Sequence, residues 1–135
     1  MELQFHHMGI ACHSISKTVQ FYLAMGYEAS CVIDDPIQHV KVCFLEKVGA
    51  PRLELLEPLD EHSPVARTLA MAGVTPYHLC YEVQDIDEAI AMMRTDRFLL
   101  VNGPVPAAAM NNRKVAFLFK KVVGLVELVE NRSNE

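Results

Sequence analysis

The sequence lacks the long apolar runs and the clusters of basic residues that would tie it to a membrane or to nucleic acid. No stretch approaches the roughly 18 apolar residues of a membrane-spanning helix, which excludes a membrane span. Residues 1–5 do not combine a basic region with an apolar run, so we expect no signal peptide. The net charge of −5 argues against nucleic-acid binding. The basic pairs Arg113-Lys114 and Lys120-Lys121 are interpreted as solvated strand ends.

The cysteines are few and lack the C-x-x-C spacing of a metal-binding or redox motif. They are Cys12, Cys31, Cys43 and Cys80, and each lies in an apolar, strand-like context. This pattern predicts buried, reduced thiols, which fits a cytoplasmic protein. Apolar residues make up 51% and charged residues 21% of the chain, and this composition indicates an ordinary globular protein.

The two halves of the chain resemble each other. A shift of 71 residues superposes a histidine and an isoleucine on their counterparts, and a shift of 73 superposes two strand-like segments. The matches are His7 with His78, Ile15 with Ile86, 41–45 with 114–118, and 54–57 with 127–130. Four matches in the same order indicate an internal repeat. The difference between the two shifts is a two-residue change in loop length.

Each half predicts the same order of secondary structure, namely a strand, a helix and then three strands. The first helix is expected over Ile15–Met25, with Ser14 as its N-cap and Gly26 at its end. The second helix is expected from its cap, Asp85, to Met93. The predicted strands lie near 5–12, 27–33, 40–45 and 52–57, and near 77–83, 98–101, 114–119 and 125–129.

The segments between these elements complete the predicted fold. Ser63-Pro64 predicts the start of a short helix over 65–71 that Gly73 ends. The proline- and alanine-rich segment 102–112 is expected to be a loop that borders a site. We therefore predict an α+β fold of two tandem β-α-β-β-β modules that form a curved mixed sheet around a metal-binding cavity. The chain is expected to be a single domain over 1–135, with module one at about 1–60, a linker helix at about 61–73 and module two at about 74–130.

The repeat singles out two histidines and two glutamates as candidate metal ligands. A duplicated unit that curls its sheet around a cavity brings equivalent positions together, here His7 with His78 and Glu54 with Glu127. Both glutamates stand in apolar strands, where unpaired carboxylates are costly and a cation relieves the cost. Two imidazoles and two carboxylates suit a divalent Zn, Co, Ni, Mn or Fe ion. The sequence does not choose among these metals.

The alternative is that these residues have ordinary structural roles. A single histidine in a strand is usually a hydrogen-bonded structural residue, and a single glutamate in a strand usually faces solvent. The recurrence of all four residues at the same places in both halves favours the metal site. Among the other histidines, His6 is expected to point to the opposite face from His7 and to be structural, while His13 and His62 are expected to be exposed loop residues.

Several motifs along nearly the whole chain resemble those of one family. They are 7–11 (HMGIA), Phe21-Tyr22 with Gly26, 40–42 (VKV), 53–59 (LELLEPL), 63–66 (SPVA), 77–79 (YHL), Asp85-Ile86 and 124–128 (GLVEL). On these residues the sequence is identified as a member of the vicinal oxygen chelate superfamily, which includes glyoxalase I and the extradiol dioxygenases. Within it, the sequence is most similar to the methylmalonyl-CoA epimerases.

The resemblance implies the same ligands that the repeat indicates, His7, Glu54, His78 and Glu127. It also implies a reaction in which the metal polarises a carbonyl group, so that the α-proton becomes acidic. A carboxylate beside the metal then moves the proton, and Glu127 can be this base because glyoxalase-type enzymes use a ligating glutamate in this way.

The sequence departs from the epimerase pattern at two places. Epimerisation usually needs two acid/base groups, one on each face of the α-carbon. Where the epimerases have a glutamate, this chain has Ile37, which cannot carry a proton. His39 would face the same way as position 37 on a regular strand and is a hypothetical substitute base, although a solvated strand-end histidine is the alternative. The family's Gly-Ala-x-Gly loop is replaced by 109–112, so the acyl or CoA pocket is expected to differ in shape.

Three functions stay open at this point. The first is a metal-dependent isomerase or epimerase that enolises an α-acidic carbonyl substrate, such as methylmalonyl-CoA or a related acyl thioester. The second is a glyoxalase I-type lyase or another metalloenzyme of the superfamily, because its members share ligands but not substrates. The third is a non-catalytic binding protein of the resistance type, although such proteins commonly lack the ligand set. In each case we expect a small-molecule partner, and paired modules of this type often form homodimers.

Overall fold

The computed structural model describes residues 2–131, which form nine strands, three α-helices and one 3-10 helix. The chain divides into two compact units, one of His7–Tyr77 and one that joins the residues up to His6 with those from His78 onward. The elements are β1 (Gln4–Ala11), α1 (Ile15–Ala24), β2 (Glu28–Ala29), β3 (Ile33–Asp35), β4 (Val40–Glu46), β5 (Leu53–Pro58), α2 (Pro64–Ala72), β6 (Thr75–Val83), α3 (Ile86–Thr95), β7 (Leu99–Ala107), η1 (Ala108–Met110), β8 (Arg113–Lys120) and β9 (Gly124–Glu130).

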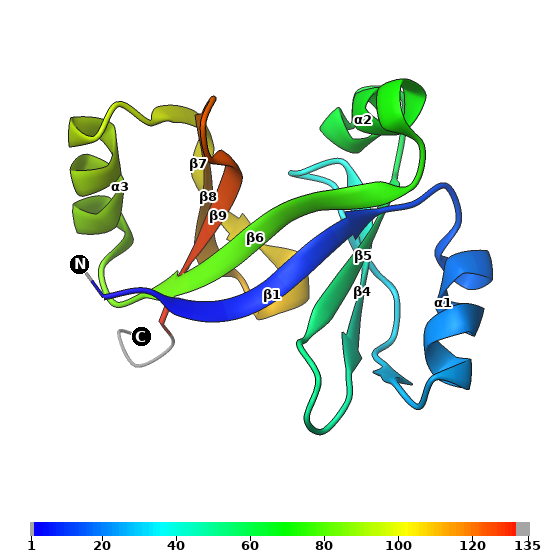
Figure 1. Cartoon of the computed structure of the whole chain (residues 1–135). Helices are drawn as coiled ribbons and strands as arrows, with labels where there is room; N and C mark the ends of the chain where they lie inside the picture. Colours follow the sequence, from blue (N-terminus) through cyan, green and yellow to red (C-terminus); the bar gives the residue numbers. More distant parts are fainter. Residues whose placement is uncertain (1, 132–135) are drawn as a thin grey trace. The chain divides into compact units, whose positions relative to one another are not determined.

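The unit of His7–Tyr77 has a sheet with the strand order β2-β4-β5-β1, and β3 pairs with β4 at its side. β1 and β5 are parallel, whereas β4 runs antiparallel to its partners. α1 packs on one face of this sheet (Figure 1) through Ile15 and Val19, which join a cluster of buried strand residues. Because side chains alternate along a strand, residues between these core positions, such as Phe44 and Glu54, point to the other face of the sheet.

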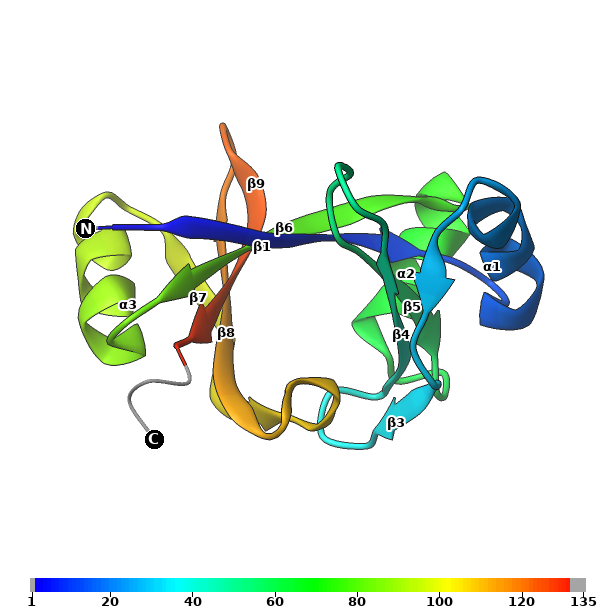
Figure 2. The same ribbon diagram turned by 90° about the horizontal axis from the view of Figure 1, so that it is seen from below.

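The second unit repeats this plan with the strand order β6-β9-β8-β7. β6 and β9 are parallel, and β8 is antiparallel to both of its neighbours. α3 packs on one face of the sheet (Figure 2), where Ile86, Ala89, Ile90 and Met93 join the buried core of the unit. The predicted α+β fold of two tandem modules, each with a helix after its first strand, is therefore confirmed.

The predicted starts of the first and third helices are confirmed by side-chain hydrogen bonds. The Ser14 hydroxyl accepts a hydrogen bond from the Lys17 backbone N–H, and the Asp85 carboxylate accepts one from the N–H of Glu88. Both contacts occupy backbone donors that the first turn of a helix leaves unpaired. α2 likewise begins after Ser63 with a proline in its first turn, and Gly73 is its C-cap.

A second capping contact was not expected from the sequence. The Ile15 N–H, the first of α1, donates to the carboxylate of Glu57 at 2.8 Å, and the Ile86 N–H of α3 donates to Glu130 at 3.1 Å. These glutamates occupy equivalent positions in the repeat, three residues after Glu54 and Glu127. Each module therefore ties the end of its last strand to the start of its helix.

The prediction of a loop over 102–112 was wrong for most of its length. β7 continues through Ala107 and pairs with β8, with register shifts between Leu100 and Asn102 and between Asn102 and Val105. The prolines of this segment are tolerated because β7 is the edge strand of its sheet and lacks a partner on one side. Gly103 is needed here, since a Cβ at this position would lie 2.4 Å from the carbonyl oxygen of Val115.

Three smaller expectations also need correction. The strand predicted near 27–33 is two short strands, β2 and β3, separated by residues 30–32. Cys31 lies in this break and is exposed, whereas the other three cysteines are buried as predicted. Arg113 is not a solvated strand end, because its guanidinium pairs with Glu82 and donates to the Glu130 carbonyl oxygen at 2.7 Å. Among the described residues, no helix combines the length and apolar character needed to cross a membrane.

The contacts of Glu57 and Glu130 predict a measurable contribution to stability. Glu57→Ala and Glu130→Ala should each lower the free energy of unfolding by about 1–3 kcal/mol, because each leaves a partly buried helix N–H without its acceptor. Glu57→Gln should cost less, since its amide oxygen still accepts. Urea unfolding measures the effect, with the exposed Glu61→Ala as a control that changes stability by no more than about 0.5 kcal/mol. Equal values for Glu57→Ala and the control would contradict this role.

Candidate metal centre

The first candidate pair lies in the unit of His7–Tyr77. His7, on β1, is fully buried, and its Nε2 lies 3.2 Å from Oε1 of Glu54 on β5. The parallel register of these strands places Gly9, two residues after His7, opposite Glu54. Phe44, which pairs with Glu54 across β4 and β5, packs its ring edge-on against the His7 imidazole, with centroids 5.2 Å apart.

The second pair repeats this arrangement in the other unit. His78, on β6, is buried, and its Nε2 lies 2.9 Å from Oε1 of Glu127 on β9. Here Cys80, two residues after His78, lies opposite Glu127 in the parallel register. Phe117 pairs with Glu127 across β8 and β9 and packs edge-on against His78, also with centroids 5.2 Å apart. The structure therefore builds one His–Glu–Phe arrangement twice.

The strands explain how these side chains come together. In the first unit, Cys43, Leu45, Leu53 and Leu55 belong to the core beneath α1. Alternation places Phe44 and Glu54 on the opposite face, away from the helix. Glu54 therefore points away from the helix, on the face of the sheet where His7 lies beside it. The buried carboxylate and imidazole compensate each other, because an isolated buried charge would be strongly unfavourable.

Both pairs carry the donor atoms that bind divalent metals. Imidazole nitrogen and carboxylate oxygen are ligands of Zn and of the other first-row ions, and all four residues belong to groups able to hold a metal. Within each pair, the imidazole nitrogens and the carboxylate oxygens are all possible ligand atoms for such an ion. The donor set therefore fits a divalent cation, and it leaves the identity of the metal open.

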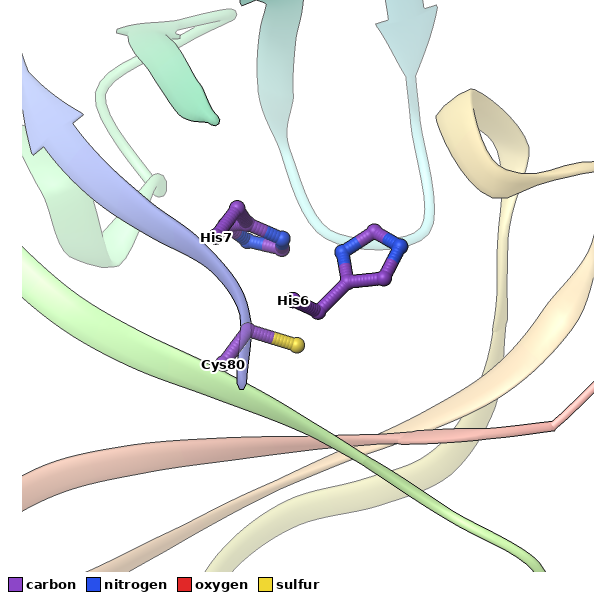
Figure 3. Close-up of side chains that lie close together, drawn as sticks. All are labelled: His6, His7 and Cys80. Atoms are coloured by element: carbon purple, nitrogen blue, oxygen red, sulfur yellow. The ribbon is translucent and has the colours of Figure 1, made fainter. Parts of the chain in front are cut away.

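Sequence reasoning missed a contact of His6 with Cys80. Figure 3 shows His6, its neighbour His7 on β1 and Cys80 on β6. The imidazole of His6 and the sulfur of Cys80 offer ligand atoms within 4.8 Å of each other, and Cys80 is fully buried. A thiol is a softer donor than the carboxylates. This contact could not be predicted from the sequence. His6 and Cys80 are 74 positions apart, and neither belongs to a motif that recurs in the other half of the chain.

The structure does not place His39 on a strand. β4 begins at Val40, and His39 lies in the turn before it with a positive φ of 59°. The expectation that His39 faces the same way as Ile37 assumed a regular strand, and that premise was wrong because residues 36–39 form a turn. His13 and His62 are exposed, as predicted.

Comparison with known proteins agrees with this fold. The family model of the glyoxalase/bleomycin resistance protein/dioxygenase superfamily matches residues 6–117. The chain belongs to this superfamily, which confirms the resemblance found in the sequence.

Individual relatives indicate which members of the superfamily this chain resembles. The mitochondrial methylmalonyl-CoA epimerase of Homo sapiens is 32% identical over 130 residues, which cover 93% of this chain and 72% of the relative. A hypothetical protein of Bacillus halodurans has a structure that matches with a TM-score of 0.86 at 33% identity, covering 98% of this chain and 96% of that one. A variant of the Streptomyces coelicolor methylmalonyl-CoA epimerase in complex with 2-nitronate-propionyl-CoA matches with a TM-score of 0.83 at 29% identity, covering 97% and 99%.

These findings confirm the predicted class of function. The chain is an enzyme of the glyoxalase superfamily and is related to its epimerases, which are isomerases.

The burial of three of the four cysteines predicts how readily each thiol reacts. Cys12 and Cys43 are almost inaccessible, and burial raises the pKa of both thiols above their ordinary values. Under native conditions a thiol reagent should therefore modify only Cys31, and all four cysteines should react after unfolding. Counting of modified thiols by mass spectrometry measures this. Rapid native modification of Cys80 would contradict the buried surroundings described for it.

Proposed function

We propose that this protein is a metal-dependent epimerase that enolises an α-acidic acyl thioester such as methylmalonyl-CoA. In this proposal His7, Glu54, His78 and Glu127 hold one divalent cation, and the two modules form a single domain around it. The observation that carries the proposal is the buried His–Glu–Phe arrangement that occurs once in each unit. A structural role for one such pair would not require its repetition at equivalent positions of the second unit.

The substrate class comes from the relatives. Homologous epimerases carry methylmalonyl-CoA or ethylmalonyl-CoA in their names, and one related structure contains methylmalonyl-CoA itself. In such a thioester the α-carbon lies between two carbonyl groups, so its proton is acidic enough for enzymatic removal. A divalent cation bound to the four residues would polarise the thioester carbonyl and stabilise the negative charge that develops on its oxygen.

The chain's own residues supply the remaining chemistry. In this proposal Glu127 removes the α-proton, since a carboxylate held beside the substrate carbonyl accepts a proton readily. Phe44 and Phe117 pack against the imidazoles of His7 and His78, which holds the rings in one orientation and keeps water from them.

A glyoxalase I-type lyase is the second candidate, and one residue favours it. Ile37 stands where the sequence resemblance expects an acid/base glutamate, and its side chain is exposed. A reaction that uses a single base would tolerate this substitution. A homodimer and a cytoplasmic location, both expected from the sequence, stay predictions.

Metal binding should be measurable on the isolated protein. After the metal is removed and then added back, we expect one divalent ion per chain and a rise in unfolding temperature. An ion present at a free concentration of 100 times its Kd stabilises the folded state by about 2.7 kcal/mol. His7→Ala and His78→Ala should each abolish most of this rise, whereas the exposed His62→Ala should keep it. Elemental analysis with calorimetry tests both points. A reloaded protein without a stoichiometric ion would refute the proposal.

Proton exchange distinguishes the epimerase from the lyase. In deuterated water, the metal-loaded protein should exchange the α-proton of methylmalonyl-CoA and convert one epimer into the other. NMR follows the exchange, and chiral analysis of the thioester follows the inversion. Glu127→Gln should lower the exchange rate by about 100-fold or more, because an amide cannot accept the proton. Bound metal without any exchange would exclude the epimerase and leave the lyase.

A further inference from the structure

The sheet edge of the first unit has one extra residue between β2 and β3. The registers of these two strands with β4 pair Ala29 with Leu45 and Ile33 with Val42. The three residues 30–32 therefore face the two residues of β4 that lie between those partners. An extra residue of this kind is a β-bulge, which bends the strand and interrupts its pairing. β2 has two residues and β3 has three, so the edge on either side of the bulge is short.

Hydrogen bonds show which residues of the bulge lie opposite Cys43. The backbone N–H of Ser30 donates to the carbonyl oxygen of Phe44 at 2.8 Å, and the N–H of Phe44 donates to the Ser30 hydroxyl at 2.9 Å. Ser30 is therefore the partner of Phe44. This pairing leaves Cys31 and Val32 opposite the single residue Cys43.

A direct contact brings the Cys43 thiol to the backbone beside Cys31. Its sulfur donates a hydrogen bond to the carbonyl oxygen of Ser30 at 3.4 Å. The carbon of this carbonyl group is bonded to the nitrogen of Cys31, so the Cα atom of Cys31 lies within about 6 Å of the Cys43 sulfur. A disulfide spans about 4.4–6.8 Å between its two Cα atoms, and residues opposite each other in an antiparallel pair are about 4.5–5.5 Å apart. The two backbones are thus close enough for a disulfide.

The two thiols differ in their access to solvent. Cys31 is exposed, whereas Cys43 is 2% exposed and belongs to the core beneath α1. Burial raises the pKa of the Cys43 thiol, and the charge of the nearby Cys31 raises it further. Cys31 is therefore the thiol that meets an oxidant in solution, and Cys43 is the thiol behind it.

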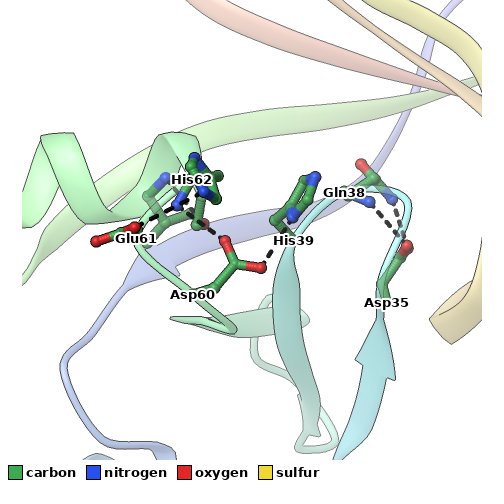
Figure 4. Close-up of polar contacts among 8 residues, drawn as sticks. Asp35, Gln38, His39, Asp60, Glu61 and His62 are labelled. Carbon is green, nitrogen blue, oxygen red and sulfur yellow. Dashed lines mark hydrogen bonds and ion pairs between the residues drawn. The ribbon is translucent and has the colours of Figure 1, made fainter.

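The other end of the hairpin formed by β3 and β4 is held by several hydrogen bonds (Figure 4). The backbone N–H of Gln38 donates to Oδ1 of Asp35 at 3.0 Å, and its side-chain amide donates to Oδ2 at 2.7 Å. The imidazole Nδ1 of His39 lies 3.0 Å from Oδ2 of Asp60. We expect the bulge, rather than this turn, to adjust when the two sulfur atoms join.

Cys12 is the alternative partner of Cys43. Both belong to the same buried cluster, and the charge of Cys43 adds to the burial that raises the pKa of the Cys12 thiol. Cys12 is fully buried, however, so neither thiol of that pair meets a dissolved oxidant first. Cys80 is also buried and belongs to the other unit. Among the four cysteines, Cys31 alone combines access to solvent with a neighbouring thiol.

We propose that Cys31 and Cys43 form a reversible disulfide when the protein meets a low-molecular-weight disulfide such as glutathione disulfide. The Cys31 thiolate attacks one sulfur of the oxidant, forms a mixed disulfide and releases one glutathione thiolate. The Cys43 thiolate then attacks the Cys31 sulfur and releases the second glutathione thiolate. The two protons of the protein thiols pass to the released thiolates. The protein is oxidised by two electrons, and one glutathione disulfide is reduced to two glutathione molecules.

The disulfide joins the outer edge of the sheet to β4, the strand whose Phe44 packs against the candidate ligand His7. It also withdraws the exposed thiol of Cys31 from further, irreversible oxidation. This inference goes beyond the proposed function and does not rest on it. Its test uses neither a substrate nor a metal, so the two can fail separately.

Incubation of the purified, fully reduced protein with glutathione disulfide tests the proposal. We expect the mass of the chain to fall by two hydrogen atoms with no glutathione retained, because the second exchange releases it. Peptide mapping without reduction should find the fragment of Cys31 joined to that of Cys43. The oxidised chain should lose its rapid reaction with maleimide, and dithiothreitol should restore both the mass and this reaction.

Three variants separate the roles of the thiols. Cys31→Ser should abolish the disulfide and the mixed disulfide, and it should unfold at the temperature of the wild type because the residue is exposed. Cys43→Ala should keep one glutathione on Cys31, since the thiol that displaces it is missing. Cys12→Ala is the matched control from the same buried cluster and should form the disulfide as the wild type does. Circular dichroism checks that each variant is folded, and the wild-type peptide map with Cys31→Ser decides the question if Cys43→Ala is not.

Several results would overturn the proposal. A wild-type chain that keeps one glutathione on Cys31 shows that Cys43 does not reach the mixed disulfide. A bond between Cys12 and Cys43, or between the Cys31 residues of two chains, assigns the oxidation to another pair. A wild-type chain that does not react with glutathione disulfide also contradicts it.

Discussion

A carboxylate buried in an apolar sheet needs a partner beside it, and each buried glutamate of the two strand pairs in this protein lies against one histidine. Glu54 and Glu127 stand among leucines and valines, with at most 3% of their surface exposed. The parallel pairing of the first and last strands of each module places the histidine within hydrogen-bond distance. Because a buried carboxylate is costly without a partner, the strands that form the core of each module also bring together a histidine and a glutamate that are candidate metal ligands.

The two modules share the buried histidine–glutamate pair and its neighbours, and they differ in their turns. Both add a phenylalanine against the histidine and a second glutamate, Glu57 or Glu130, that binds the first N–H of the helix. These contacts fix the strand that carries the ligand relative to the helix of its module. The modules diverge in their turns, where the first has His39 and the second has Asn112 at the same left-handed position. The duplication therefore preserves the buried pair of each module but not the residue at this turn position.

Much of the fold and the candidate ligands could be predicted because they depend on local pattern and on repetition. The helix caps Ser14 and Asp85 are read from their neighbours in the sequence, and His7 with Glu54 recur as His78 with Glu127. The start of β7 was predicted, but its continuation over 102–107 could not be, since its prolines are compatible with a strand only at the edge of a sheet, and the position of a strand in its sheet is not a local property. Asp60 was missed for the same reason, because its contact with His39 joins positions 21 residues apart.

The central claim is that one divalent cation binds to the histidine and glutamate of both modules together. A crystal structure of the metal-loaded protein, with data collected at the absorption edge of the metal, tests it most directly. The account predicts one anomalous peak per chain, coordinated by Nε2 of His7 and His78 and by carboxylate oxygens of Glu54 and Glu127. An ion bound by the pair of one module only, or by His6 and Cys80, would contradict the account.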